Sequence, residues 1–87
     1  MITLIFGRQF LKCVKTIPPA QHKKLDRLLA LLQKDPLHPS LHTKPLDGHL
    51  SGYYSFRITR DWRVIFRFIN PRIIELAEVG HRKDIYR

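Results

Sequence analysis

The fold is decided by the stretch Tyr53–Phe68, which reads YYSFRITRDWRVIFRF. Apolar and polar residues alternate on both sides of the tight link Arg60-Asp61, and a period of two is typical of a strand with one buried face. We therefore predict two neighbouring strands whose apolar sides face a core. The apolar positions are Tyr54, Phe56, Ile58, Trp62, Val64, Phe66 and Phe68. The polar positions include Arg57, Arg63 and Arg67.

Two helices are predicted ahead of this stretch. The first carries apolar residues at i, i+4 and i+7, which are Phe10, Val14 and Ile17. Pro18-Pro19 ends it, because a proline inside a helix removes a backbone hydrogen bond and clashes with the preceding turn. The second helix runs from about Ala20 to Lys34, with an apolar stripe formed by Leu25, Leu28, Leu29 and Leu32. The short link at Pro18-Pro19 favours packing of the two helices against each other as a helical hairpin.

The remaining segments complete the expected order of elements. Ile2–Phe6 is apolar and rich in β-branched residues, which predicts a short buried strand that ends at Gly7. Asp35–Gly52 contains three prolines and two glycines and is expected to be an extended surface loop. Asn70-Pro71 marks a turn before a third strand, Ile73–Val79, and Gly80–Arg87 is expected to be a polar tail.

Together these elements predict an α+β fold in one domain that spans residues 1–87. The N-terminal strand and the helical hairpin should pack on one face of a small antiparallel sheet, in the order β-α-α-β-β-β. Only the hairpin can cover the apolar side of the sheet. The sequence therefore predicts an open opposite face that is rich in arginine, with Arg57, Arg63 and Arg67 side by side.

Composition narrows the class of partner. The 87-residue chain has a formal net charge of +9, which for so small a domain favours a polyanionic partner such as nucleic acid or an acidic protein segment. Its apolar stretches are far too short to span a membrane or to form a signal peptide, so we expect a cytoplasmic protein. The single cysteine, Cys13, excludes a disulfide framework and a cysteine-rich zinc site.

The C-terminal third holds the residue types that RNA cleavage requires. Arginine matches and stabilises a charged phosphate, histidine transfers protons near neutral pH, and tyrosine donates a proton or stacks on an unpaired base. These residues are expected to converge on one face, although each taken alone is compatible with an ordinary surface role. They are Arg57, Arg63, Arg67, His81, Arg82 and Tyr86.

No metal or other cofactor is expected. His38 and His42 have the i, i+4 spacing of a metal pair, but Pro39 between them disfavours the helix that such a pair needs. The chain has neither a phosphate-binding glycine-rich loop nor an acidic pair suited to Mg²⁺. His22 and His49 are expected to be plain surface residues. Nuclease chemistry in this chain would therefore be metal-independent.

Three segments resemble the RelE/ParE toxin superfamily, and most closely its RelE- and YoeB-like mRNA interferases. Lys44–Ile58 resembles the loop and strand entry of these toxins, and Trp62–Phe66 resembles their arginine-bearing strand. Gly80–Tyr86, GHRKDIY, resembles their C-terminal signature. Each segment is short, but their order and spacing agree with the family over nearly the whole chain. The resemblance implies a RelE-like fold.

The resemblance also implies a function and a set of site residues. Such toxins of type II toxin–antitoxin systems enter the ribosomal A site and cleave mRNA without metal, which inhibits translation. By position, Arg57 and Arg63 would hold the scissile phosphate, His81 would transfer a proton and Tyr86 would orient the substrate. The implied RNA-binding residues are Arg67, Arg82, Lys44, Lys83, Arg60 and Ser55. The implied partners are the ribosome with its mRNA and a small cognate antitoxin that binds through an acidic segment in a heteromeric complex.

Two departures leave the general base open. Some members carry Glu or His where this chain has Lys44, and others carry lysine at the position of Ser55. Two alternatives therefore stay open beside the mRNA endoribonuclease. One is a ParE-like DNA gyrase inhibitor without nuclease activity. The other is a degenerate, non-catalytic module that only binds an antitoxin.

Overall fold

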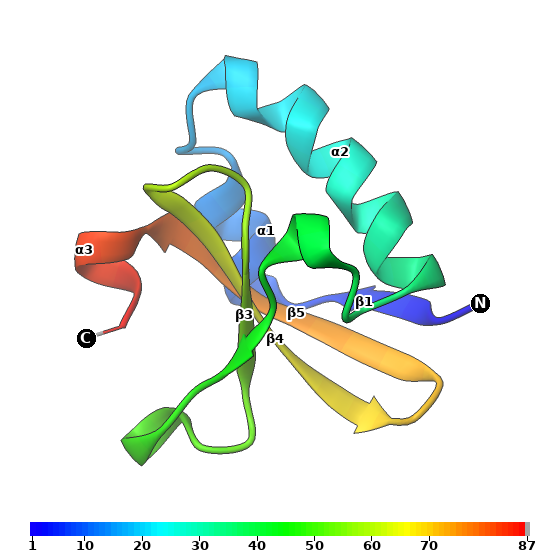
Figure 1. The fold of residues 1–87 in the computed structure, drawn as a ribbon. Coiled ribbons are helices and arrows are strands. Elements are labelled where there is room, and N and C mark those ends of the chain that lie inside the picture. The colour runs from blue at the N-terminus through cyan, green and yellow to red at the C-terminus, as the bar shows by residue number, and fades with distance from the viewer. Residues whose placement is uncertain (87) are drawn as a thin grey trace.

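The computed structural model describes residues 1–86, in which two helices lie on one side of a twisted sheet (Figure 1). A third, short helix follows the last strand at the end of the chain. The strands are β1 (Thr3–Phe6), β2 (Lys44–Pro45), β3 (Tyr54–Arg57), β4 (Trp62–Asn70) and β5 (Ile73–His81). The helices are α1 (Arg8–Val14), α2 (Pro19–Lys34) and α3 (Arg82–Ile85). The predicted α+β fold and the order of its main elements are confirmed.

The sheet has five strands in the order β1-β5-β4-β3-β2. Strands β2 to β5 pair antiparallel, as expected, but β1 pairs parallel with β5, so the sheet is mixed. The prediction that Ile2–Phe6 is a buried strand was wrong. β1 lies at the edge of the sheet, where Ile5 is 42% and Phe6 46% exposed. Its apolar sequence predicted a strand but could not tell an edge position from a central one.

The core lies between the sheet and the two helices α1 and α2. Phe10 and Ile17 from the α1 region and the stripe of α2 bury against one side of β3, β4 and β5. Leu25, Leu28 and Leu32 are buried, whereas Leu29 is half-buried at the margin. The strand residues of this cluster are Phe56, Ile58, Val64, Phe66, Ile74, Leu76 and Val79. One apolar core therefore fixes which side of β3 and β4 is left for function.

Leu28→Ala should lower the free energy of unfolding by about 2–4 kcal/mol, because it removes buried methyl groups and leaves a cavity. Leu28 is only 8% exposed in the core. Leu37→Ala is the matched control, since Leu37 is 72% exposed and its loss should change the free energy of unfolding by less than about 0.5 kcal/mol. Urea unfolding followed by circular dichroism measures both. Equal effects of the two substitutions would contradict the packing of α2 on the sheet.

A bulge in β5 changes which side its last residues face. The register between β4 and β5 skips Ala77, which has no partner on β4. An extra residue in one strand reverses the alternation of side chains beyond it. Leu76 and Val79, three positions apart, therefore both face the core. Strict alternation from Leu76 would put His81 on the opposite side, but the bulge places it on the core side, opposite Trp62.

The sequence suggested that the C-terminal segment is a polar tail, and this prediction was wrong. Residues 80 and 81 continue β5, and α3 turns back over the side of the sheet opposite the core. The buried side chain of Ile85 lies over Gly80, where an added Cβ would come within 3.9 Å of it. Arg87 lies outside the described residues. The loop predicted for Asp35–Gly52 is also more ordered than expected, since it contains β2 and two short 3₁₀ turns.

The predicted open face is consequently half covered. Ser55 and Ile65 on this side are each 2% exposed, and Arg63 is 8% exposed. Arg57 and Arg67 remain exposed. The face is therefore a partly enclosed site, and its arginines differ in how far solvent can reach them.

Candidate functional site

Two arginines face each other across β3 and β4. Arg57 and Arg63 are direct partners in the antiparallel register, a position that brings Cβ atoms to within about 4.5–5.5 Å of each other. Like charges in this position destabilise a sheet. Among residues 1–86, no carboxylate forms an ion pair with either guanidinium. An anion bound between them would remove the repulsion, so the pair forms a candidate phosphate site.

Burial and hydrogen bonds hold Arg63 in place. Its Nε and Nη2 donate to the backbone carbonyl of Arg60, at 3.4 and 3.3 Å. Both contacts are long, and a neutral carbonyl does not balance the charge of a cation that is only 8% exposed. The guanidinium is therefore oriented toward the turn between β3 and β4, and it remains available to a bound anion.

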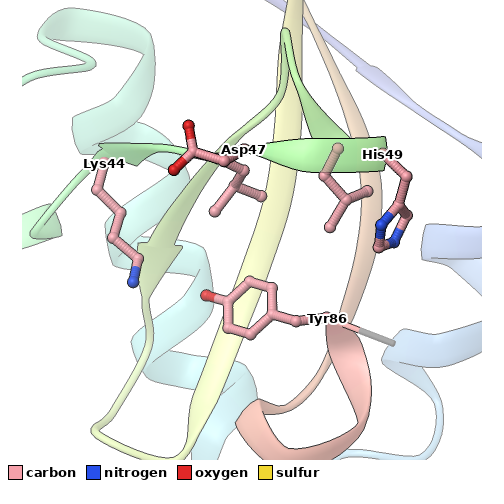
Figure 2. Close-up of a pocket in the computed structure, with 6 residues that line it drawn as sticks. Lys44, Asp47, His49 and Tyr86 are labelled. Carbon is pink, nitrogen blue, oxygen red and sulfur yellow. The ribbon is translucent and has the colours of Figure 1, made fainter.

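Lys44 and Tyr86 lie on the same side of the sheet as this pair. Lys44 pairs with Ser55 on the neighbouring strand, and its Nζ lies 5.7 Å from the centroid of the Tyr86 ring. Figure 2 shows the Tyr86 hydroxyl directed toward the side of Lys44. This hydroxyl oxygen is buried and has no hydrogen-bond partner among the described residues. A buried hydroxyl without a partner costs about 1–3 kcal/mol, which a substrate oxygen could offset.

A cavity of about 190 Å³ opens beside Tyr86 (Figure 2). Its walls are Lys44, Leu46, Asp47, His49, Leu50 and Tyr86. Sequence reasoning treated His49 as a plain surface residue and did not single out Asp47. Both are exposed, but the turn at Gly48, which has a φ of 65°, brings them to the cavity. Asp47 and His49 lie in the same sequence segment as Lys44, and this is the sequence signal that could have identified them as site residues.

His81 is held at the start of α3. Its Nδ1 accepts a hydrogen bond from the backbone N–H of Lys83 at 3.2 Å, and its ring packs edge-on against Trp62 with 5.4 Å between centroids. Because an accepting Nδ1 carries no proton, the neutral ring bears its proton on Nε2. In this conformation Nε2 is a hydrogen-bond donor. Nε2 can therefore hydrogen-bond to a leaving oxygen, whereas transfer of a proton to that oxygen requires the imidazolium, whose Nδ1 no longer accepts from Lys83.

Arg63 and His81 do not share one face, contrary to the expected convergence. Arg63 pairs with Gly80 and His81 pairs with Trp62, so their side chains leave the sheet on opposite sides. The backbone N–H of Arg82 donates to the carbonyl of Asp61 at 2.7 Å, which ties the end of β5 to the β3–β4 turn. The two side chains therefore flank the same end of the sheet.

The other predicted RNA-binding residues are spread more widely. Glu75 pairs with Arg67 at 2.8 Å, and this hydrogen bond and charge raise the pKa of the Arg67 guanidinium. Asp61 lies 3.4 Å from Arg82 in a largely exposed pair, which contributes little to stability. Lys83 is exposed on α3, and Arg60 lines a second cavity near the β3–β4 turn. Arg67 and Arg82 are thus partly neutralised, unlike Arg57 and Arg63.

Residues 1–86 contain no group of three histidine, cysteine or acidic side chains arranged to hold a metal ion. Within the same residues, no helix is long and apolar enough to cross a membrane.

Comparison with known proteins places this fold and site in a family. The model of the family described as "ParE toxin of type II toxin-antitoxin system, parDE" matches residues 4–86. The chain therefore belongs to this toxin family, within the RelE/ParE superfamily of type II toxin–antitoxin systems. The superfamily that the sequence motifs suggested is confirmed.

Individual relatives agree with this assignment. Toxin YoeB of Mycobacterium bovis and toxin RelK of Mycobacterium tuberculosis are each 38% identical over 59 residues, which cover 68% of this chain and 69% of the relative. The RelB–RelE antitoxin–toxin complex of Methanococcus jannaschii matches with a TM-score of 0.75 and 26% identity over 94% of both chains. YafQ of Escherichia coli covers 100% of both chains with a TM-score of 0.82, and at 23% identity it shows the fold alone.

Proposed function

We propose that this toxin is a ribosome-dependent, metal-independent mRNA endoribonuclease that inhibits translation in the cytoplasm. The observation that carries the proposal is the Arg57–Arg63 pair, two opposed cations of which one is buried and neither has a carboxylate partner among residues 1–86. Such an arrangement stabilises a phosphate whose negative charge increases during reaction.

The chemistry needs one bond to form and one to break. The 2′-oxygen of a nucleotide attacks the adjacent phosphorus, and the bond from phosphorus to the 5′-oxygen breaks, leaving a 2′,3′-cyclic phosphate and a 5′-hydroxyl. Arg57 and Arg63 stabilise the charge on the pentacovalent phosphorus. His81 enters this step as the imidazolium, donates its Nε2 proton to the leaving 5′-oxygen and returns to the neutral ring, in which Nδ1 again accepts from Lys83. A base must take the proton of the 2′-hydroxyl, and among residues 1–86 the one carboxylate that lines the cavity beside Tyr86 is that of Asp47.

The remaining residues bind rather than react. Tyr86 orients the substrate by hydrogen bonding through its unpartnered hydroxyl or by stacking on a base. Lys44 supplies positive charge beside it. Further contacts to the backbone of the RNA come from Arg60, Arg67, Arg82, Lys83 and Ser55.

A cognate antitoxin is the second partner that we propose. A net charge of +9 favours an acidic segment, and the similar structure from Methanococcus jannaschii is an antitoxin–toxin complex. Complementary charge speeds encounter at low ionic strength. Stopped-flow association with the protein encoded beside this toxin should therefore slow as salt is raised, and rates that ignore ionic strength would contradict charge complementarity.

The function is tested with purified, antitoxin-free protein on ribosomes that carry a defined mRNA. Cleavage within the A-site codon and 2′,3′-cyclic phosphate ends are expected. Treating the toxin alone with EDTA, and removing the EDTA before the ribosomes are added, should leave the rate unchanged. A well-folded protein that cuts nothing would exclude the nuclease.

The gyrase inhibitor is the second candidate, because the matching family is named for ParE. It predicts no cleavage of mRNA and loss of DNA supercoiling by gyrase in the presence of this toxin. A supercoiling assay on the same preparation therefore separates the two functions. Inactivity in both assays, with retained antitoxin binding, would indicate the non-catalytic module.

A further inference from the structure

A second cavity, of about 170 Å³, lies between α2 and the β3–β4 turn. Its basic walls come from three separate segments of the chain: the cation Lys24 from α2, the imidazole of His42 from the segment before β2, and the cations Arg57 and Arg60 from β3 and the turn. Ser40 and Thr59 add hydroxyl groups. Antiparallel pairing of Lys44 with Ser55 brings the segment before β2 to the end of β3, and both His42 and Arg57 line the cavity there.

The charges in this cavity are not balanced. Among residues 1–86, neither Lys24 nor Arg57 nor Arg60 forms an ion pair, and no acidic residue lines the cavity. The Thr59 hydroxyl oxygen accepts from the backbone N–H of Trp62 at 3.2 Å, which leaves its own hydrogen free to donate. The cavity thus gathers three cations and hydroxyl donors without a carboxylate.

His42 reaches the cavity through an unusual backbone conformation. It is the only residue other than glycine with a positive φ in the described chain, with φ 51° and ψ 42°. An L side chain in the left-handed region is uncommon, and such conformations cluster at binding sites. Glycine would adopt this conformation without steric cost. The imidazole therefore lies beside the cations at a position where backbone sterics alone favour glycine.

We propose that this cavity binds a phosphate of an RNA backbone next to the scissile one. Arg57 belongs both to this cavity and to the Arg57–Arg63 pair, which makes the two phosphate positions neighbours on one strand. The inference rests on the proposed function, because it concerns the same RNA. It assigns a binding role to Lys24 and His42, which lie outside the three motif segments.

The walls favour a phosphate over an acidic protein segment. Protein interfaces place apolar or aromatic anchors in pockets. Of the described residues that line this cavity, only Ile58 is apolar, and it is 1% exposed within the core. A phosphate needs only charge and hydrogen-bond donors, which the cavity supplies.

The test measures binding of a 2′-O-methyl RNA oligonucleotide, which cannot be cleaved, by fluorescence anisotropy at several salt concentrations. Loss of one phosphate contact to a single strand lowers the steepness of the plot of log K against log salt by about 0.7. Near 0.1 M salt this corresponds to an affinity that is about fivefold weaker. Lys24→Ala should show this loss. Lys23→Ala is the matched control, because Lys23 is the exposed neighbour outside the cavity. His42→Gly keeps the backbone conformation and should also weaken binding.

The outcomes separate this inference from the nuclease proposal. Weaker oligonucleotide binding by the Lys24 and His42 variants supports the site even if the wild type cuts nothing. A loss seen only with ribosomes overturns the placement next to the scissile phosphate and assigns the cavity to ribosomal RNA. Binding equal to that of the Lys23 variant in both assays overturns the site. So does a loss confined to binding of polyglutamate, which would assign the cavity to an acidic protein.

Discussion

Arg63→Ala should lower the rate of mRNA cleavage on programmed ribosomes by about 10²-fold or more, the usual loss when a donor to a developing oxyanion is removed. Arg63 is opposite Arg57 and is oriented by the carbonyl of Arg60. Arg63→Lys keeps the charge but not the planar fork, so it should recover only part of the rate. Single-turnover kinetics on ribosomes of fixed A-site codon measures all three proteins.

The Arg63 variant should remain folded. It loses two long hydrogen bonds, but it also loses the repulsion between two opposed cations. We expect the free energy of unfolding to change by no more than about 1 kcal/mol. Arg57→Ala removes the same repulsion from an exposed position and should reduce cleavage without reducing stability. Wild-type rates in the Arg63 variant would remove it from the site, and a collapse of stability would make its role structural.

Local pattern predicted the parts of the fold that depend on neighbours in sequence. The alternation around Arg60-Asp61 gave β3, β4 and their buried side, and Pro18-Pro19 separated the two helices where the structure does. The same alternation placed Arg57 opposite the core. These features follow from the period of a strand and from the geometry of proline, which act over a few residues.

Features that depend on distant packing were not predictable in this way. Nothing in Ile2–Phe6 shows that β1 has only one neighbour, so its exposure was missed. The four residues of α3 are too few for a helical period. The cavity beside Tyr86 joins the Asp47 turn to the end of the chain, a contact across nearly half the sequence. The sequence also gave no sign that Lys24 and His42 approach Arg57.

The bulge at Ala77 had the largest effect on the site, because it decides the side on which His81 lies. The sequence shows only that Leu76 and Val79 are three residues apart. The structure shows that both are buried, which strict alternation in a strand would not allow. Without this unpaired residue, His81 would lie on the same face as Arg63. With it, His81 approaches the β3–β4 turn from the other side. A motif such as GHRKDIY gives residue identities but not this geometry.

His81→Ala should lower the cleavage rate by about 10²–10⁴-fold if the imidazole transfers a proton. Alanine, however, also removes the cap that the Nδ1 atom provides to the backbone N–H of Lys83. His81→Asn separates the two roles, because the asparagine oxygen can accept the same hydrogen bond but cannot transfer a proton near neutral pH. The asparagine variant should melt at the temperature of the wild type and cleave as poorly as the alanine variant.

The pH dependence distinguishes proton transfer from positioning. If Nε2–H protonates the leaving 5′-oxygen, the rate of the wild type should carry a titration that both His81 variants lack, whereas the remaining slow cleavage should depend on pH only through other groups. RNA with a 5′-thio leaving group needs no protonation at that atom, so it should restore cleavage by the asparagine variant toward the wild-type rate. If asparagine alone restores cleavage of ordinary mRNA, or if the thio substrate restores nothing, His81 acts as the cap of α3 and a different group supplies the proton.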